Sequence, residues 1–194
     1  PLNHENYLKM ADYLAEIANN ILPGTQIDSI AYGCTSGTVA IGDKRITDEI
    51  QKSKASAYVS TPITATLKAF KNLQLKKIAV LTPYPKKVNK TIFDFLTKSN
   101  IEIVSFSSFN LEYDSDIANV DPQYLIETVT KIDHKDADAV FVSCTALRIV
   151  EVLDQIEKQI SKHVISSNQA MIWDCLRSVN INNSVSGYGA LFSH

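Results

Sequence analysis

The stretch LKKIAVLTPY, residues 75–84, decides the fold class, because it has the composition of a buried strand that ends in a turn. The next segment, KKVNKTIFDFLTKS (86–99), has the apolar spacing of an amphipathic helix. It is followed by IEIVSFSSF (101–109), whose β-branched and aromatic residues favour a second strand. Strand, helix and strand in this order predict a βαβ unit, and therefore an α/β protein with a parallel sheet covered by helices.

The same alternation extends in both directions along the chain. Downstream, it predicts a helix from Asp121 to about 132, a strand at 137–143, a helix at 146–160, a strand at 163–167 and a helix at 169–179. Upstream, it predicts a helix at about 5–22, a strand at 27–33, a loop and helix across 35–53, a strand at 57–60 and a helix at about 62–72, with Pro62 in its first turn.

Composition narrows the classes of function. The 194 residues are 45% hydrophobic, enough for a packed core, and the net charge of -2 gives no field to attract nucleic acid or an anionic membrane. No apolar run approaches the ~20 residues that cross a bilayer, and the first residues lack a secretory signal, so we expect a cytoplasmic protein. An odd count of three cysteines, without CxxC spacing, predicts free thiols.

Two segments of the chain echo each other. IDSIAYGCTSGTVAI (27–41) and ADAVFVSCTALRIVE (137–151) both run through an apolar strand, one small residue, Cys, Thr and a helix. Each is followed by a strand that ends in small polar residues before another helix, STPITATLKAF (60–70) and SSNQAMIWDCL (166–176). We therefore expect two pseudo-symmetric, Rossmann-like lobes, each a parallel sheet flanked by helices, one formed by 1–72 with 166–194 and the other by 73–165.

Cys34 and Cys144 are the candidate reactive groups. Ligands of open α/β sheets bind beyond the carboxyl ends of the strands, where both cysteines fall, and a helix N-terminus there lowers a thiol's pKa and holds a carboxylate. A single strand-end cysteine is usually packing, but two in matching positions favour chemistry. Cys175, beside Trp173 and Leu176 in an amphipathic pattern, is interpreted as packing.

Other candidates allow two interpretations each. Tyr84 follows an apolar strand, so its hydroxyl either donates to a carboxylate or an enediolate, or closes the end of the sheet. Ser167 and Asn168 either contact an anion or cap the last helix. The four histidines form no metal-binding pattern, and no glycine-rich nucleotide fingerprint is present, so neither a metal nor a cofactor is predicted.

The motifs together carry a resemblance. YGCTSGTVAIG, STPITATLKAF, IAVLTPY, SCTALR, SNQAMIWDCLR and the closing GYGALF occur in this order over about residues 25–190. This set resembles the aspartate/glutamate racemase superfamily, and within it the group of maleate cis-trans isomerases, arylmalonate decarboxylases and ectoine-utilisation proteins.

The resemblance implies a site between two facing lobes, in which one cysteine from each lobe approaches opposite faces of a small carboxylate without a cofactor. Cys34 and Cys144 match these positions. It further implies that Thr35, Ser36 and Tyr84 bind a carboxylate, and that the opposing side is lined by Thr145, Ser167 and Asn168.

The chain also departs from the family pattern at two places. Family members normally begin with a further strand and a loop whose Asn grips the substrate, and this chain is expected to start after them. The loop in which maleate isomerases place another carboxylate-binding Asn is LEYDSDIANVDP (111–122) here, and no Asn is assigned to that role.

The leading hypothesis is a cofactor-independent, two-cysteine isomerase or racemase of a small carboxylate, either a maleate-like dicarboxylate or an amino-acid derivative. Such a protein requires no nucleic acid or membrane partner, and a homo-oligomer is compatible with it. One alternative is a malonate-type decarboxylase, but the branch that it resembles carries Gly in place of Cys34. An alternative of another class is a non-catalytic small-acid-binding protein.

Because hydroxyl groups follow Cys34, we predict that it has the lower pKa of the two thiols.

Overall fold

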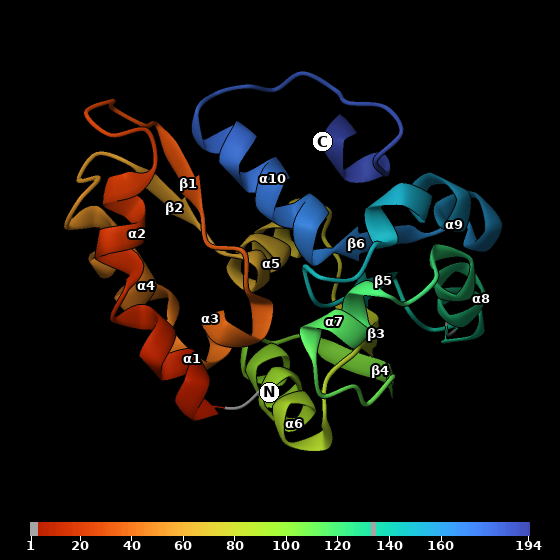
Figure 1. Cartoon of the computed structure of the whole chain (residues 1–194). Helices are drawn as coiled ribbons and strands as arrows, with labels where there is room; N and C mark the ends of the chain where they lie inside the picture. Colours follow the sequence, from red (N-terminus) through yellow and green to blue (C-terminus); the bar gives the residue numbers. More distant parts are fainter. Residues whose placement is uncertain (1–3, 133–134) are drawn as a thin grey trace.

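The computed structural model describes residues 4–132 and 135–194, whose strands form two parallel sheets (Figure 1). The smaller sheet pairs β1 (Ser29–Ala31) with β2 (Tyr58–Ser60). The larger sheet has the order β4-β3-β5-β6, with bounds Lys77–Thr82 for β3, Glu102–Ser108 for β4, Ala139–Val142 for β5 and His163–Ser166 for β6. All described strand pairs are parallel, which confirms the predicted α/β class with helix-flanked parallel sheets.

Helices connect and cover these strands. The α-helices are α1 (His4–Ala11), α2 (Leu14–Asn20), α3 (Thr35–Ile41), α4 (Asp43–Gln51), α5 (Pro62–Asn72), α6 (Lys86–Lys98), α7 (Asp114–Ala118), α8 (Pro122–Ile132), α9 (Leu153–Ile160) and α10 (Ser167–Ser178). Two 3-10 helices, η1 (Ile149–Val152) and η2 (Ala190–Ser193), complete the set. Helices α8 and α9 pack against each other and against the large sheet. Among the described segments, no helix is long and apolar enough to span a bilayer.

The predicted helices differ from the observed ones in four places. The helix expected at 5–22 is two helices, because the amides of Asp12 and Tyr13 bond three residues back and interrupt the α-helical ladder. The helix expected within 35–53 is divided at Gly42, whose φ of 92° is outside the helical range. The helix expected from 146 begins at 149 as a 3-10 turn, and α7 was not predicted.

Each sheet has its own apolar core. The larger core surrounds β3, β5 and β6, and all four residues of β5 are buried from solvent. The smaller core joins α1, α2 and α4 to β1, and it includes Tyr32. Because parallel strands buried on both faces must be apolar, the runs at 78–81 and 139–142 are the most regular part of the sequence pattern.

Helix α10 connects the two sheets. It begins directly after β6, while its body packs against β1, β2 and α5. The buried Asp174 accepts hydrogen bonds from Tyr58, Ser60 and Lys68, which lie on β2 and α5. A charged group at this depth is stable because all three partners donate to it. The assignment of 166–194 to the first lobe, like the boundary at 72/73, stays a prediction.

Candidate active site

Cys34 lies between β1 and α3, at the carboxyl end of the small sheet. It is the N-cap residue of α3, and its Sγ accepts a hydrogen bond from the Gly37 amide at 3.3 Å. The Ser36 Oγ lies 3.9 Å from the same sulfur. Cys34 is half-buried, so a residue whose sulfur is held by a backbone donor is not fully sealed from solvent.

Cys144 follows β5 of the large sheet, and its surroundings differ from those of Cys34. Its side chain is buried, and its φ of 97° is rare for a residue with a Cβ. A turn separates it from the next helix, which begins only at Ile149. The expectation that a helix N-terminus directly follows both cysteines is therefore wrong for Cys144.

The two cysteine loops are joined through Ser167, the first residue of α10. Its Oγ accepts one hydrogen bond from Thr35 Oγ1 at 2.9 Å and another from the Cys144 amide at 3.1 Å. A second connection runs from Thr145 Oγ1 to the Gly33 carbonyl at 2.6 Å. Three segments distant in sequence are thus fixed side by side, and the cysteines belong to neighbouring loops.

Four of the six predicted substrate-binding residues fall into two groups. Thr35 and Ser167 are buried and bonded to each other, so their hydroxyls hold the loops together. Thr145 and Asn168 are half-buried, and the Asn168 Nδ2 donates to the Thr145 carbonyl at 2.9 Å. The Thr145 hydroxyl donates to Gly33, while Asn168 Nδ2 carries a second N–H that can donate to a ligand.

Tyr84 lies beside Cys144, and its position is fixed by its backbone. The Tyr84 carbonyl accepts from Asn89 Nδ2 at 2.6 Å and from Ser108 Oγ at 2.8 Å. Its hydroxyl lies 3.3 Å from the Ser143 Oγ. Burial and the neighbouring Cys144 raise the pKa of Tyr84 well above its usual value, so at neutral pH this hydroxyl remains a proton donor.

Burial dominates the electrostatics of both thiols. It raises the pKa of Cys34, although the Gly37 amide and the Ser36 hydroxyl lower it. Burial raises the pKa of Cys144 to about 11, against smaller opposing contributions from the Ala146 amide and the Tyr84 hydroxyl. The expectation that the protein environment lowers both pKa values is therefore wrong, because desolvation of the thiolate outweighs the donors.

Three residues of the site were missed in the sequence. Tyr7 accepts a hydrogen bond from Ser36 Oγ at 2.8 Å, and burial raises its pKa to about 12. Tyr32 lies in the smaller core with its hydroxyl near Cys34. The Asp114 carboxylate at the start of α7 is close enough for its charge to contribute to raising the pKa of both thiols. Tyr7 and Tyr32 were hidden in apolar patterns, and Asp114 in an irregular loop.

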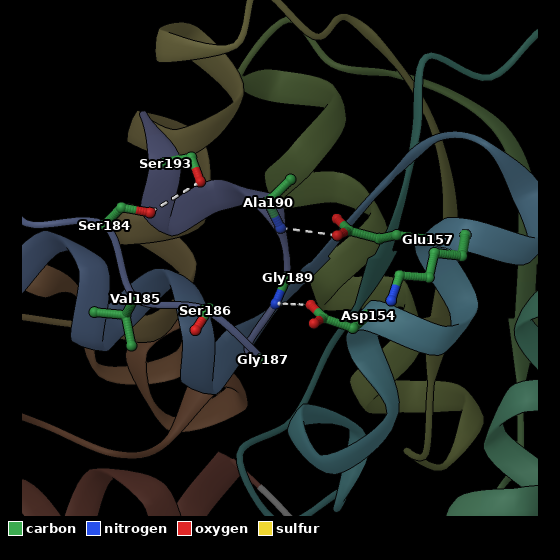
Figure 2. Close-up of a pocket in the computed structure, with 10 residues that line it drawn as sticks. Asp154, Glu157, Ser184, Val185, Ser186, Gly187, Gly189, Ala190 and Ser193 are labelled. Carbon is green, nitrogen blue, oxygen red and sulfur yellow. Dashed lines mark hydrogen bonds between the residues drawn. The ribbon is translucent and has the colours of Figure 1, made fainter.

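The closing GYGALF motif forms a separate cavity of about 390 Å³ against α9 (Figure 2). Asp154 Oδ1 accepts from the Gly189 amide at 2.7 Å, and Glu157 Oε2 from the Ala190 amide at 2.8 Å (Figure 2). Gly189 has a φ of 85°, and a Cβ there would collide with the side chain of Gln169. Both carboxylates are thus occupied in fastening the C-terminal segment beside α10.

Cys175 lies half-buried on α10. Its interpretation as a packing residue stays a prediction.

This architecture defines a class of protein: an α/β fold with two parallel sheets and one strand-end cysteine on each. The chain belongs to the arylmalonate decarboxylase family, whose model matches residues 4–192. Maleate isomerase from Geobacillus stearothermophilus is 26% identical over 180 residues, which cover 89% of this chain and 72% of that protein. The predicted family is confirmed, as is the prediction of an enzyme of this group.

Solved structures have the same fold. A cysteine-to-alanine variant of maleate isomerase from Pseudomonas putida, crystallised with maleate, superposes with a TM-score of 0.89 at 21% identity, over 99% of this chain and 80% of that one. A cysteine-to-serine mutant of Nocardia farcinica maleate cis-trans isomerase with a covalently bound succinylcysteine intermediate gives 0.88 at 17% identity, over 97% and 80%.

Proposed function

We propose that this protein is a cofactor-independent isomerase or racemase of a small carboxylate, with Cys34 and Cys144 acting as a pair. The observation that carries the proposal is the junction at Ser167, whose hydroxyl accepts from Thr35 beside one cysteine and from the amide of the other. This junction holds the strand-end loops of two sheets in a fixed relation. Two thiols held in this way can supply a base or nucleophile and an acid to one substrate.

The surroundings assign different roles to the two thiols. Burial raises the pKa of Cys34 as well, but Cys34 is only half-buried and receives the Gly37 amide, so we assign it the role of the thiol that loses its proton on reaction and then attacks or removes a proton. Cys144 is buried with a pKa of about 11 and therefore keeps its proton near pH 7. A protonated thiol beside the Tyr84 hydroxyl is suited to donate a proton.

For a cis alkene diacid, the steps balance without a cofactor. The Cys34 thiolate adds to one alkene carbon, the C–S bond forms, and the π pair takes the Cys144 proton at the neighbouring carbon. The new single bond rotates. The Cys144 thiolate then removes that proton, the electron pair restores the double bond, and the C–S bond breaks to release Cys34 and the trans isomer.

For a racemase, the same pair works without addition. The Cys34 thiolate removes the α-proton from one face, and the Cys144 thiol protonates the opposite face. The maleate isomerases among the relatives favour the addition route and a dicarboxylate. We propose that Asn168 and the Ser36–Tyr7 pair contact the carboxylates, while Thr35, Thr145 and Ser167 position the loops.

The test is turnover by the purified protein in D₂O, followed by proton NMR with maleate, aspartate, glutamate, hydantoins and arylmalonates. The proposal expects conversion or exchange at one carbon with at least one acid, and loss of that signal in Cys34→Ser and in Cys144→Ser. Binding without conversion or exchange for every acid would instead favour a non-catalytic binding protein.

The free thiols fit a reducing compartment. A cytoplasmic location stays a prediction, and so does a homo-oligomer.

A second candidate, decarboxylation of a malonate-type acid, is favoured by the name of the matching family. That chemistry needs one cysteine to protonate an enediolate, and here Cys144 would serve with Tyr84 as donor. The two candidates differ in what they require of Cys34. If Cys34→Ser still releases CO₂ from an arylmalonate and Cys144→Ser does not, the protein is established as the decarboxylase.

A further inference from the structure

The hydroxyl of Tyr32 is an unexplained polar group. The side chain is 7% exposed, and its Oη makes no hydrogen bond of ordinary geometry among the described residues, although it lies close enough to Cys34 for each group to shift the pKa of the other. A buried hydroxyl without a partner is destabilising, and native proteins rarely keep one without a reason. The ring packs in the smaller core, where phenylalanine would serve equally well.

The hydroxyl lies against the reactive end of Cys34. A Cβ placed on Gly37 would be 2.6 Å from the Tyr32 Oη and 2.9 Å from the Cys34 Sγ, so both atoms border the same small space beside Gly37. The backbone keeps the two residues close, because the Cys34 amide donates to the Tyr32 carbonyl at 3.0 Å in a three-residue turn.

The other donors around this sulfur are nearly exhausted. The Gly37 amide already donates to Sγ, and the Ser36 hydroxyl donates to Tyr7. When Cys34 loses its proton, the sulfur becomes a charged and much stronger acceptor than the neutral thiol. The Tyr32 O–H, which also contributes to lowering the pKa of Cys34, is then a further donor beside the Ser36 hydroxyl.

We propose that Tyr32 is a positioning residue whose hydroxyl donates a hydrogen bond to the Cys34 thiolate in the reactive state. The inference rests on the proposed role of Cys34. Burial and the neighbouring Cys34 raise the pKa of Tyr32, so the phenol keeps its proton while the thiol is deprotonated. The bond stabilises the thiolate and aims its remaining lone pairs away from the core.

The test is Tyr32→Phe, which keeps the ring and removes only the hydroxyl. Alkylation of Cys34 by iodoacetamide is followed against pH by mass spectrometry of tryptic peptides, with the Cys144 peptide as an internal reference. We expect the apparent pKa of Cys34 to rise by about 1 unit, which slows its alkylation about tenfold below that pKa. The control is Tyr13→Phe, because the Tyr13 side chain is 60% exposed.

An unchanged or lower apparent pKa of Cys34 in Tyr32→Phe would overturn the inference. Gly37→Ala provides a second variant, because its Cβ must displace the Tyr32 hydroxyl or the sulfur, and it should raise the pKa of Cys34 as well. In turnover, Tyr32→Phe should shift the rising limb of the kcat profile by the same amount and recover activity at higher pH. A purely structural loss would lower kcat at every pH.

The outcomes separate this inference from the proposed function. Alkylation reports the thiolate whether or not the enzyme turns over. Full activity in Cys34→Ser would remove the proposed role of Cys34 and with it the catalytic meaning of Tyr32. An inactive Cys34→Ser with an unchanged thiol pKa in Tyr32→Phe would remove only the inference.

Discussion

The surroundings of Cys34 and Cys144 differ although the local sequences match. Both residues are preceded by a small residue and followed by threonine. Cys34 has a φ of -136°, an ordinary extended value, and begins a helix, whereas Cys144 has a φ of 97° and precedes a turn. Equivalent sequence positions therefore hold one half-buried thiol on an ordinary extended backbone and one buried thiol on a strained backbone, which suits an attacking group and a proton donor.

The largest expected effects are on catalysis. Each of Cys34→Ser and Cys144→Ser should lower kcat at least about 10²–10⁴-fold, because serine is a poor base and a poor acid near pH 7. If the reaction is of the addition type, Cys144→Ser should still form a covalent substrate adduct on Cys34, visible as a mass increase of the intact protein. Cys34→Ser should form none.

The control for these variants is Cys175→Ser, which should retain activity within about twofold. An adduct that persists in Cys34→Ser and disappears in Cys144→Ser would reverse the roles assigned to the two thiols.

The second prediction concerns alkaline stability. The pKa of Cys144 rises from about 9 in the unfolded chain to about 11 in the folded protein, so the folded state binds more protons between these values. Stability is then fully present below pH 9 and decreases as pH rises through 11. The Cys144 contribution is about 3 kcal/mol in the free energy of unfolding.

Urea unfolding at pH 8, 9, 10 and 11 measures this loss. Cys144→Ala should flatten the decrease, while Cys175→Ala should reproduce the wild-type curve. Equal slopes in wild type and Cys144→Ala would show that the buried thiol does not titrate as described.

Part of this comparison was readable from the sequence. The strands before Cys34 and Cys144 were predicted because apolar runs bounded by turns are local signals, and parallel strands place their carboxyl ends together. The backbone conformation of Cys144 was not predictable, because a positive φ at a residue with a Cβ is enforced by contacts distant in sequence. One such contact is the hydrogen bond that the Cys144 amide donates to the Ser167 hydroxyl. Tyr7 and Tyr32 were not identified as site residues, because apolar periodicity predicts that a ring is buried but gives no information about what its hydroxyl contacts.

The third prediction uses the backbone difference directly. At a φ of 97°, glycine is favoured over a residue with a Cβ by about 1 kcal/mol, so Cys144→Gly should be more stable than Cys144→Ala by about that amount. The same pair at Cys34, with a φ of -136°, should show the opposite order or no difference. Urea unfolding of the four variants at pH 7 tests this order. Equal free energies of unfolding for Cys144→Ala and Cys144→Gly would mean that the backbone at residue 144 has relaxed.

The smallest expected effect tests the charge that both thiols share. The Asp114 carboxylate contributes to raising the pKa of Cys34 and of Cys144, so Asp114→Asn should lower both and speed their alkylation at pH 8 by roughly twofold at low salt. Asp116→Asn, on the same short helix, is the matched control and should change neither rate. The acceleration should diminish at 1 M salt, where the Debye length is about 3 Å. If alkylation of only one thiol is faster, the Asp114 carboxylate faces a single sulfur. Asp114 would then be a further difference between the surroundings of Cys34 and Cys144.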